Sequence, residues 1–353
     1  MLEPVYFDAR YIRVEHHDGI SRFSAGLLEA LNRRTKVIAI ICDSRQLEKL
    51  PVGIDYVQLN EPTSTLAEIL IAKRLNHIGA KIVFSPMQTM GSWFRKYKLI
   101  LTLHDLIYYA HPTPPPSFSW PIRIGWRLFH LSYLPQKVML NRADTVATVS
   151  QTTKSLIEKH KLTKRPVVVV YNAGTETQNS KHSKPNNSLV YMGSFMDYKN
   201  VECLVDAMKL LPDFKLELLS RISPDRKRQL IERAGNAAER VIFRNGVTDA
   251  EYQRILDESF ALVSASRDEG FGIPVIEAMG RGTPAVISDI EIFHEIGGVA
   301  ARFFNPNRPE ELASQIMDLA KDWNSASKAG IEQSKKFNWD ASADALLVAL
   351  QGL

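Results

Sequence analysis

Short apolar runs alternate with amphipathic stretches through the first half of the chain. Runs of consecutive hydrophobic residues predict buried strands at 35–42, 81–85, 99–103, 145–149 and 167–170. Apolar residues at helical spacing predict helices between them, among others at 22–32 and 66–78. Strands that are apolar throughout are typical of parallel sheets covered on both faces, so this half is predicted to form a doubly wound α/β domain.

The same alternation returns in the second half. Strands are predicted at 188–192, 215–219, 241–243, 261–264 and 284–287, and helices at 201–210, 224–234, 249–258, 274–280 and 339–350. Two similar α/β halves in succession predict two Rossmann-like domains facing across a cleft, which is a common place for a ligand.

A polar stretch without periodicity separates the two halves. It covers 179–188, contains Pro185 and is typical of an interdomain linker. The first domain is therefore predicted to span 1–178 and the second 189–336. The remaining C-terminal helix, 337–353, is predicted to pack back toward the first domain.

One loop of the second half carries most of the candidate chemistry. Glu269 and the glycines Gly270 and Gly272 follow a predicted strand, and Glu277 lies early in a helix that Pro274 begins. Glycines let a backbone approach a ligand, and the free N–H groups of a helix start favour an anion. Carboxylates accept hydrogen bonds from pairs of sugar hydroxyls. Composition alone favours an ordinary strand–loop–helix joint, in which carboxylates balance the helix N-terminus.

The order of residues in this loop resembles the signature of glycosyltransferase family four, E-G-F-G-x-P-x-x-E-A-M followed by G-x-P-V. Glu269 and Glu277 match its paired glutamates, with seven residues between them. The resemblance continues along nearly the whole chain, in Gly19-Ile20-Ser21-Arg22-Phe23, His104-Asp105-Leu106, Val149-Ser150, Tyr171-Asn172-Ala173-Gly174, Gly193 to Lys199-Asn200 and Gly246-Val247-Thr248-Asp249. It implies the GT-B fold, and transfer of a sugar from a nucleotide-sugar donor with retention of the anomeric configuration.

The resemblance also implies roles for residues of the second domain. Glu277 would hold the ribose hydroxyls of the donor, Val247 would border the base, and Lys199 would pair with the diphosphate. Glu269 would hold the hydroxyls of the donor sugar together with the amides that follow it, those of Gly270, Phe271 and Gly272. Relatives of this family generally act without a bound metal, so neither a metal nor a cofactor is expected beside the donor.

Two residues of the first, acceptor-side domain would reach across the cleft: His104, which joins Glu269 and Lys199 as a catalytic candidate, and Gly19. The chain departs from the family in its phosphate loop, where Ser194 and Tyr198 stand in place of the usual arginines. Arg221 could supply the missing charge, although it could equally be an ordinary surface arginine.

Composition adds a prediction about partners. The 353 residues suffice for two domains, and 45% hydrophobic with 24% charged residues is typical of a globular chain. Residues 1–180 carry 23 Lys and Arg against 14 Asp and Glu, whereas residues 181–353 carry 21 against 25. This uneven charge predicts that the first domain meets an anionic partner.

Two segments that mix aromatic and basic residues, 93–98 and 120–130, are typical of elements that lie in a membrane interface. A partly buried helix with a basic edge, or by composition a nucleic-acid surface, would give the same pattern. Since family relatives often use lipid-linked acceptors, weak contact with anionic membrane is predicted, and no nucleic acid. The N-terminus lacks a signal-peptide pattern and no apolar run approaches the roughly 20 residues of a membrane helix. A cytoplasmic protein, peripheral on the inner face of the membrane, is expected.

The motifs together look most like bacterial mannosyltransferases of surface polysaccharide synthesis. They predict GDP-mannose as donor and a glycan or lipid-linked saccharide as acceptor. A UDP-sugar donor and a non-catalytic GT-B partner subunit stay open as alternatives, the latter because of the missing arginines. An epimerase of the same fold is less favoured, because it would be expected to place extra histidines and carboxylates around the hexose and the glutamate motif indicates a transferase instead.

Overall fold

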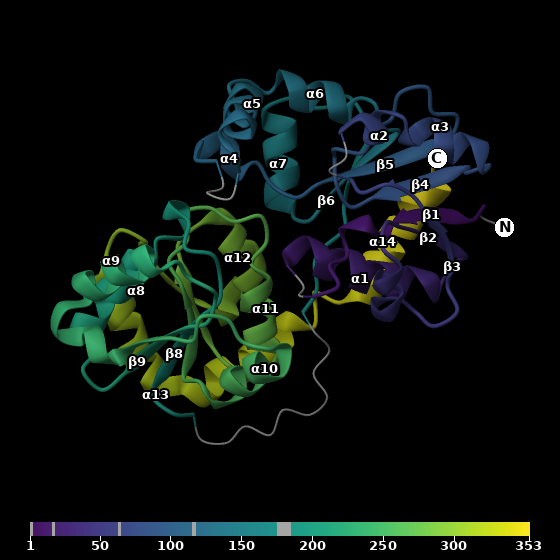
Figure 1. Ribbon diagram of the computed structural model, residues 1–353. Coiled ribbons are helices and arrows are strands. Elements are labelled where there is room, and N and C mark those ends of the chain that lie inside the picture. The colour runs from purple at the N-terminus through teal and green to yellow at the C-terminus, as the bar shows by residue number, and fades with distance from the viewer. Residues whose placement is uncertain (1–2, 16–17, 63–64, 115–117, 175–184) are drawn as a thin grey trace. The chain divides into compact units, whose positions relative to one another are not determined.

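The computed structural model describes residues 3–15, 18–62, 65–114, 118–174 and 185–353. The chain divides into two compact units, Met1–Ala173 with Asn338–Leu353, and Gly174–Phe337. Each unit is built on one parallel sheet with helices on both of its faces (Figure 1). Most of the predicted linker, 179–188, lies outside the described residues.

The first unit holds a seven-stranded sheet in the order β3-β2-β1-β4-β5-β6-β7, and all of its pairings are parallel. The strands are β1 (Val5–Asp8), β2 (Val37–Ile41), β3 (Asp55–Gln58), β4 (Ile82–Ser85), β5 (Lys98–Leu103), β6 (Thr145–Thr148) and β7 (Val167–Val169). The five strands predicted in this half are confirmed. The sequence did not predict β1 or the polar edge strand β3.

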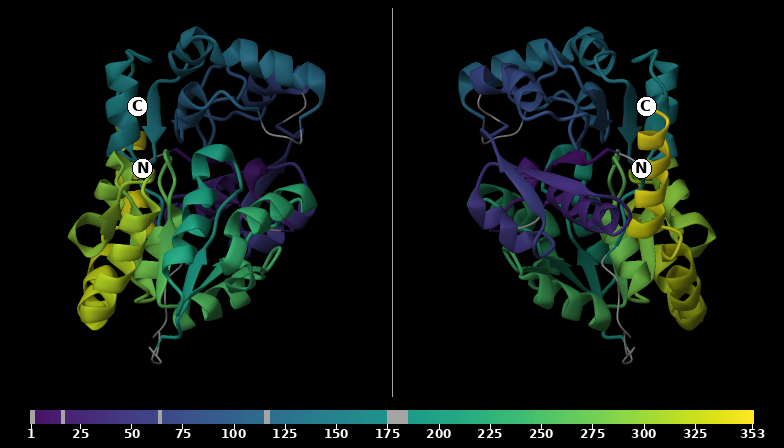
Figure 2. Two further views of the ribbon diagram at one scale, coloured as in Figure 1. Left: turned by 90° about the vertical axis from the view of Figure 1, so that its left-hand side faces the viewer. Right: turned by 90° about the vertical axis from the view of Figure 1, so that its right-hand side faces the viewer.

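Eight α-helices of the first unit are described: α1 (Gly19–Asn32), α2 (Thr65–Ile69), α3 (Ile71–His77), α4 (Ile107–Ala110), α5 (Trp120–His130), α6 (Leu134–Leu140), α7 (Gln151–Lys159) and α14 (Trp339–Gln351). The helix predicted at 66–78 is two short helices joined at Leu70. α14 lies alongside α1, as Figures 1 and 2 show. The Trp339 indole fills the space beside Gly26, where a Cβ would come within 2.3 Å of the ring.

The second unit holds a six-stranded parallel sheet in the order β10-β9-β8-β11-β12-β13. Its strands are β8 (Ser188–Tyr191), β9 (Lys215–Leu218), β10 (Val241–Phe243), β11 (Ala261–Ser264), β12 (Ala285–Ser288) and β13 (Arg302–Phe304). The five predicted strands are confirmed. β8, β11 and β12 are buried along their whole length, which explains why their sequences are apolar without alternation.

The α-helices of the second unit are α8 (Val201–Ala207), α9 (Pro224–Ala234), α10 (Asp249–Glu258), α11 (Ile273–Gly280), α12 (Glu291–Gly297) and α13 (Pro309–Ser334). Short 3-10 segments cover Ala9–Tyr11, Ser44–Lys49, Asp197–Lys199, Met208–Leu210, Gly235–Arg240 and Gly298–Ala300 in the chain as a whole. α13 was not predicted; it bends at Asp322 and packs through Gly330 against Met279 of α11. α11 is therefore held between the sheet and α13.

Candidate functional site

The strand order of the second unit brings two loops together. The chain proceeds outward from β8 through β9 and β10, and in the opposite direction from β11 through β12 and β13. β8 and β11 are hydrogen-bonded neighbours, so the loops after them leave the same edge of the sheet side by side. Ligands of open α/β sheets bind at the carboxyl ends of the strands where the order reverses. Lys199 follows β8 and Glu269 follows β11, and both lie at this point.

Lys199 and Glu269 form an ion pair. Lys199 Nζ donates to Glu269 Oε1 at 2.6 Å, and each side chain is only 14% exposed. Ser266 Oγ donates to the same oxygen at 2.8 Å. The other oxygen, Oε2, has no partner among the described residues. One oxygen of the carboxylate is therefore fixed, and the second can accept a hydrogen bond from a ligand.

Asn200 holds the two loops in register. Its backbone adopts a left-handed conformation with φ of 51°, and its side chain is 4% exposed. Asn200 Nδ2 donates to the carbonyl of Ala265 at 3.2 Å and to that of Pro306 at 2.6 Å. A second tie joins the backbones, from the Arg267 N–H to the Tyr198 carbonyl at 2.7 Å. Lys199 is thus placed by a rigid turn and not by its own flexible side chain alone.

Helix α11 begins at the edge of this site. Gly272 stands at its N-cap with φ of 99°, and a Cβ there would lie 2.9 Å from the Phe293 ring. No side chain of the described residues caps the helix. Pro274 has no N–H and the Val275 N–H donates to the Gly272 carbonyl at 2.9 Å, so the helix start offers an anion the Ile273 N–H and its positive dipole end. Phe271 is buried with its ring edge against Phe337, at 5.7 Å between centroids. Glu277 lies one turn into the helix and is 7% exposed.

Arg221 and Val247 extend the same edge of the sheet. Arg221 follows β9, and Val247 follows β10 after Gly246, whose φ is 104°. A Cβ on Gly246 would lie 3.1 Å from Cγ of Arg221, so the arginine packs over the glycine. The Arg221 guanidinium is exposed and pairs with no carboxylate of the described residues. In strand order the edge presents Val247, Arg221, Lys199 and Glu269.

In the first unit, His104 stands at the end of β5. Its Nε2 lies 2.7 Å from the Pro86 carbonyl, and its ring meets the edge of Phe23 at 5.0 Å. Burial lowers the pKa of His104 from 6.5 to about 4, so the ring is neutral near pH 7. A carbonyl only accepts, which assigns the proton to Nε2 and leaves Nδ1 as an acceptor.

Gly19 begins α1, the helix that carries Phe23. Asp18 caps this helix by accepting from the Ser21 N–H at 2.9 Å. Phe23 therefore links the helix that starts at Gly19 to the loop that carries His104 within the first unit. The reach of Gly19 and His104 toward a bound donor stays a prediction.

The first unit also contains a buried ion network that was not predicted from the sequence. Arg10 Nε donates to Asp8 at 2.7 Å, and one of its terminal nitrogens donates to Glu68 at 2.7 Å. Glu68 also accepts from the Gly91 N–H at 3.2 Å. Asp8 ends β1, next to β4, where the strand order of this sheet reverses. The charged pair Asp8 and Arg10 directly after an apolar run was the signal that could have revealed it.

Two protein families match this chain in adjoining segments. Glycosyltransferase Family 4 matches residues 17–173, and Glycosyl transferases group 1 matches residues 173–337. The chain belongs to the family-four glycosyltransferases. The O-antigen chain mannosyltransferase RfbU of Salmonella typhimurium is 26% identical over 318 residues, which cover 85% of this chain and 87% of that one.

Solved structures of other proteins share the fold of this chain. Sucrose-phosphate synthase from Thermosynechococcus elongatus superposes with a TM-score of 0.74 at 19% identity, covering 99% of this chain and 98% of that one. HepE of Anabaena, in complex with UDP and glucose, gives 0.72 at 18% identity with both chains fully covered. The two Rossmann-like units of this glycosyltransferase are those of the GT-B fold. The described part of the enzyme contains no helix that is long and apolar enough to cross a membrane.

Proposed function

We propose that this glycosyltransferase moves a hexose, mannose from GDP-mannose, to a glycan or a lipid-linked saccharide, with retention of configuration and without a bound metal. The site in the second unit carries the proposal. Glu269 has one oxygen fixed by Lys199 and Ser266 and the other open to a sugar hydroxyl. Lys199 comes from the loop after β8, and α11 begins at Ile273, in the same loop as Glu269.

The chemistry of such a transfer needs a stabilised leaving group. As the sugar departs, negative charge builds on the diphosphate oxygens. A lysine and helix N–H groups preset against that charge lower the barrier, because they need no reorganisation during the reaction. Lys199, α11 and the exposed Arg221 are the groups of this unit that supply positive potential, and they would take the place of a metal. Among the described residues, no group of three or more His, Cys, Asp or Glu could hold a metal ion.

The donor is proposed from the relatives. RfbU is named a mannosyltransferase, which supports GDP-mannose, whereas the structure of HepE with UDP and glucose supports a UDP-sugar as the second candidate. The first unit would contribute His104 and the Gly19 loop to the same reaction. A peripheral location on the inner face of the membrane is proposed because no residue of α5 is buried and its exposed side chains are apolar and basic.

Release of nucleotide and free sugar tests this function. The purified protein is incubated with GDP-mannose or UDP-glucose, with and without a chelator, and the products are followed by NMR. We expect release of GDP and of mannose with the configuration of the donor, unaffected by the chelator. Glu269→Gln should slow release strongly, whereas Glu232→Gln, an exposed residue of the same unit, should not. Binding of GDP without any release would instead identify a non-catalytic partner subunit.

A further inference from the structure

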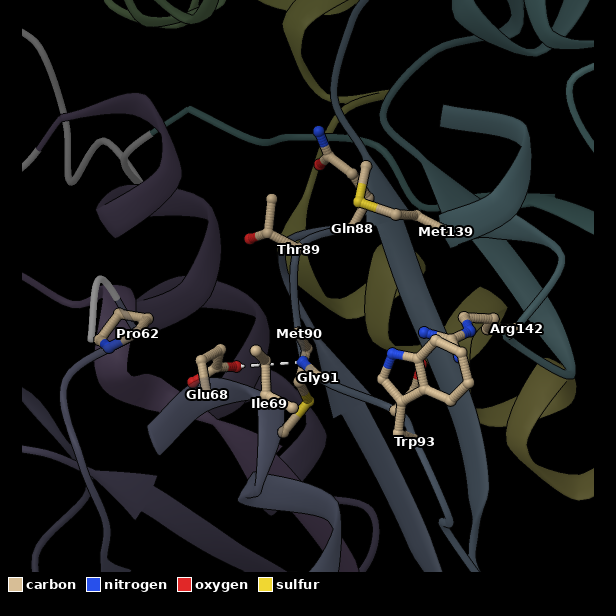
Figure 3. Close-up of a pocket in the computed structure, with 11 residues that line it drawn as sticks. Pro62, Glu68, Ile69, Gln88, Thr89, Met90, Gly91, Trp93, Met139 and Arg142 are labelled. Atoms are coloured by element: carbon tan, nitrogen blue, oxygen red, sulfur yellow. Dashed lines mark hydrogen bonds between the residues drawn. The ribbon is translucent and has the colours of Figure 1, made fainter. Parts of the chain in front are cut away.

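The first unit contains a hollow of about 330 Å³. It lies between α2, the end of α6 and the segment that links β4 to β5, and Figure 3 shows the side chains around it. Trp93 and Arg142 form one wall, and Glu68 and Ile69 lie on the opposite side (Figure 3). Gln88, Thr89 and Ser92 add polar groups to the lining. Hereafter this hollow is the Trp93 pocket.

Arg142 forms no ion pair with the acidic side chains that the structure describes. Its guanidinium carbon lies 3.4 Å from the centroid of the Trp93 ring. The guanidinium has no hydrogen bond or ion pair with any residue that the structure describes. Asp144 is close in the chain, but it pairs with Arg95 at 2.8 Å. A stacked guanidinium with its fork of N–H donors unused is prepared for a carboxylate or a phosphate.

Trp93 offers an apolar surface beside that charge. The side chain is 53% exposed although Arg142 covers it from one side. The open part of an indole suits the C–H face of a sugar ring, since both are apolar and flat. Gln88 and Ser92 can exchange hydrogen bonds with sugar hydroxyls at the same time.

Contacts between Glu68 and Gly91 hold the two sides of the Trp93 pocket together before any ligand binds. Glu68 is held by Arg10 and holds the Gly91 N–H, as described above. Gly91 packs so tightly that a Cβ there would lie 1.8 Å from the Glu68 carbonyl oxygen. The segment that carries Thr89 to Trp93 is therefore fixed by a buried ion pair, and little conformational entropy remains to be lost on binding.

We propose that the Trp93 pocket binds a saccharide that carries a phosphate group, with the phosphate on Arg142 and the sugar on Trp93. The proposal deepens the transferase function and rests on it, because the saccharide would belong to the acceptor. A lipid-linked saccharide and a soluble sugar phosphate share this chemistry. Helix α6, which contributes Met139 to the pocket, also exposes Leu134 and Val138, so a lipid chain would find apolar surface beside it.

Binding of small probes tests the pocket. Mannose 1-phosphate, mannose and inorganic phosphate are titrated calorimetrically into the protein with GDP in excess, so that the second unit is occupied. We expect binding of mannose 1-phosphate that Arg142→Gln and Trp93→Ala each weaken about tenfold or more, equivalent to 1.4 kcal/mol or more. Lys159→Gln, which changes an exposed charge of α7 in the same unit, should leave it unchanged.

Two results would overturn the proposal. Equal binding of inorganic phosphate would mean an anion site without a sugar, and equal binding by Arg142→Gln would place the ligand elsewhere. Stabilisation by GDP in the variants shows that they are folded. Tighter binding of a mannosyl phosphate that bears a decyl chain identifies the lipid-linked source, and equal binding identifies the soluble one. Because binding is measured without turnover, failure of the pocket and failure of the proposed transfer are separate observations.

Discussion

At the scale of single residues, Lys199 and Glu269 form an ion pair. The family resemblance implies that they bind different parts of the donor, Lys199 the diphosphate and Glu269 the sugar hydroxyls. The ion pair keeps a partly buried lysine satisfied in the absence of ligand. A diphosphate bound at Lys199 would compete with Glu269 for the N–H donors of the Lys199 ammonium group. The freed carboxylate can then accept from the sugar while it stays bonded to Ser266. With Lys199 on the diphosphate as proposed, donor binding and the placement of Glu269 would be coupled through one lysine.

Replacement of Glu277 by alanine should weaken donor binding more than it slows the bound complex. The residue is predicted to hold ribose hydroxyls, away from the reacting carbon, and loss of a charged acceptor costs about 1.5–3 kcal/mol. We expect the donor KM to rise at least tenfold with kcat little changed, as measured by steady-state kinetics. Glu232→Ala on the exposed surface of the same unit serves as control. An unchanged donor KM would refute the assigned role.

His104 should make the folded protein sensitive to acid. Burial lowers its pKa from 6.5 to about 4, so the unfolded chain takes up a proton at a higher pH than the folded one. The contribution of neutral His104 to stability is therefore complete above pH 6.5 and is lost as the pH falls toward 4. In His104→Gln the amide can keep the bond to the Pro86 carbonyl, and nothing titrates.

The comparison is made by thermal denaturation at pH 7.5 and 4.5. We expect the midpoint of the wild type to fall further than that of His104→Gln, by the equivalent of at most about 3 kcal/mol. NMR of the ring protons should show no titration of His104 above pH 5. A midpoint near 6.5 in that titration would contradict the buried, neutral histidine.

At the scale of elements, the start of α11 depends on a glycine. Gly272→Ala would place a methyl group 2.9 Å from Phe293 at a φ that L-residues rarely adopt, which costs about 1–3 kcal/mol. We expect a lower denaturation midpoint and weaker stabilisation by GDP. Gly125→Ala in α5 is the matched control, since its Cβ would meet open space and helix propensity would improve. Equal midpoints for Gly272→Ala and the wild type would contradict the strained cap.

The elements also show what a sequence reveals. All ten predicted strands are present. They could be predicted because strands of a buried parallel sheet are largely apolar and therefore stand out in the sequence. The loop with Glu269 was singled out by its glycines and carboxylates, which are residue types suited to a ligand site. The contact of Lys199 with Glu269 and the anchoring by Asn200 depend on the pairing of β8 with β11, which no local pattern contains. α13 was missed because its polar face and its bend at Asp322 obscure the helical period.

At the scale of the whole molecule, the basic first half of the chain also exposes apolar side chains on helix α5. α5 buries none of its residues, and Trp120 is 74% and Leu128 62% exposed. No Asp or Glu occurs between Asp105 and Asp144, so Arg123 and Arg127 have no acidic neighbour in the chain. Rings that insert among headgroups, together with about 1 kcal/mol from each basic residue, give reversible binding to an anionic bilayer. α6 follows α5, as Figure 1 shows, and it also exposes the apolar side chains of Leu134 and Val138.

Sedimentation with vesicles should reveal that binding. At low salt we expect the protein to pellet with anionic vesicles and to stay in solution with neutral ones. Arg123→Glu combined with Arg127→Glu should release it while stabilisation by GDP is kept. Lys159→Glu with Lys164→Glu, two exposed charges of the same unit, should reduce the pelleted fraction less. Equal behaviour with both kinds of vesicle would exclude membrane docking through α5.

The return of the C-terminal helix to the first unit sets an order of assembly during synthesis. Gly174–Phe337 is one continuous segment and can fold as soon as it leaves the ribosome. The first unit, although made earlier, lacks α14 until Asn338–Leu353 emerges. Until then Gly26 and Phe23 lack their packing contacts with Trp339, and Arg34 lacks its ion pair with Asp344. A stop codon before Asn338 would therefore remove α14 and damage the part of the protein that was translated first.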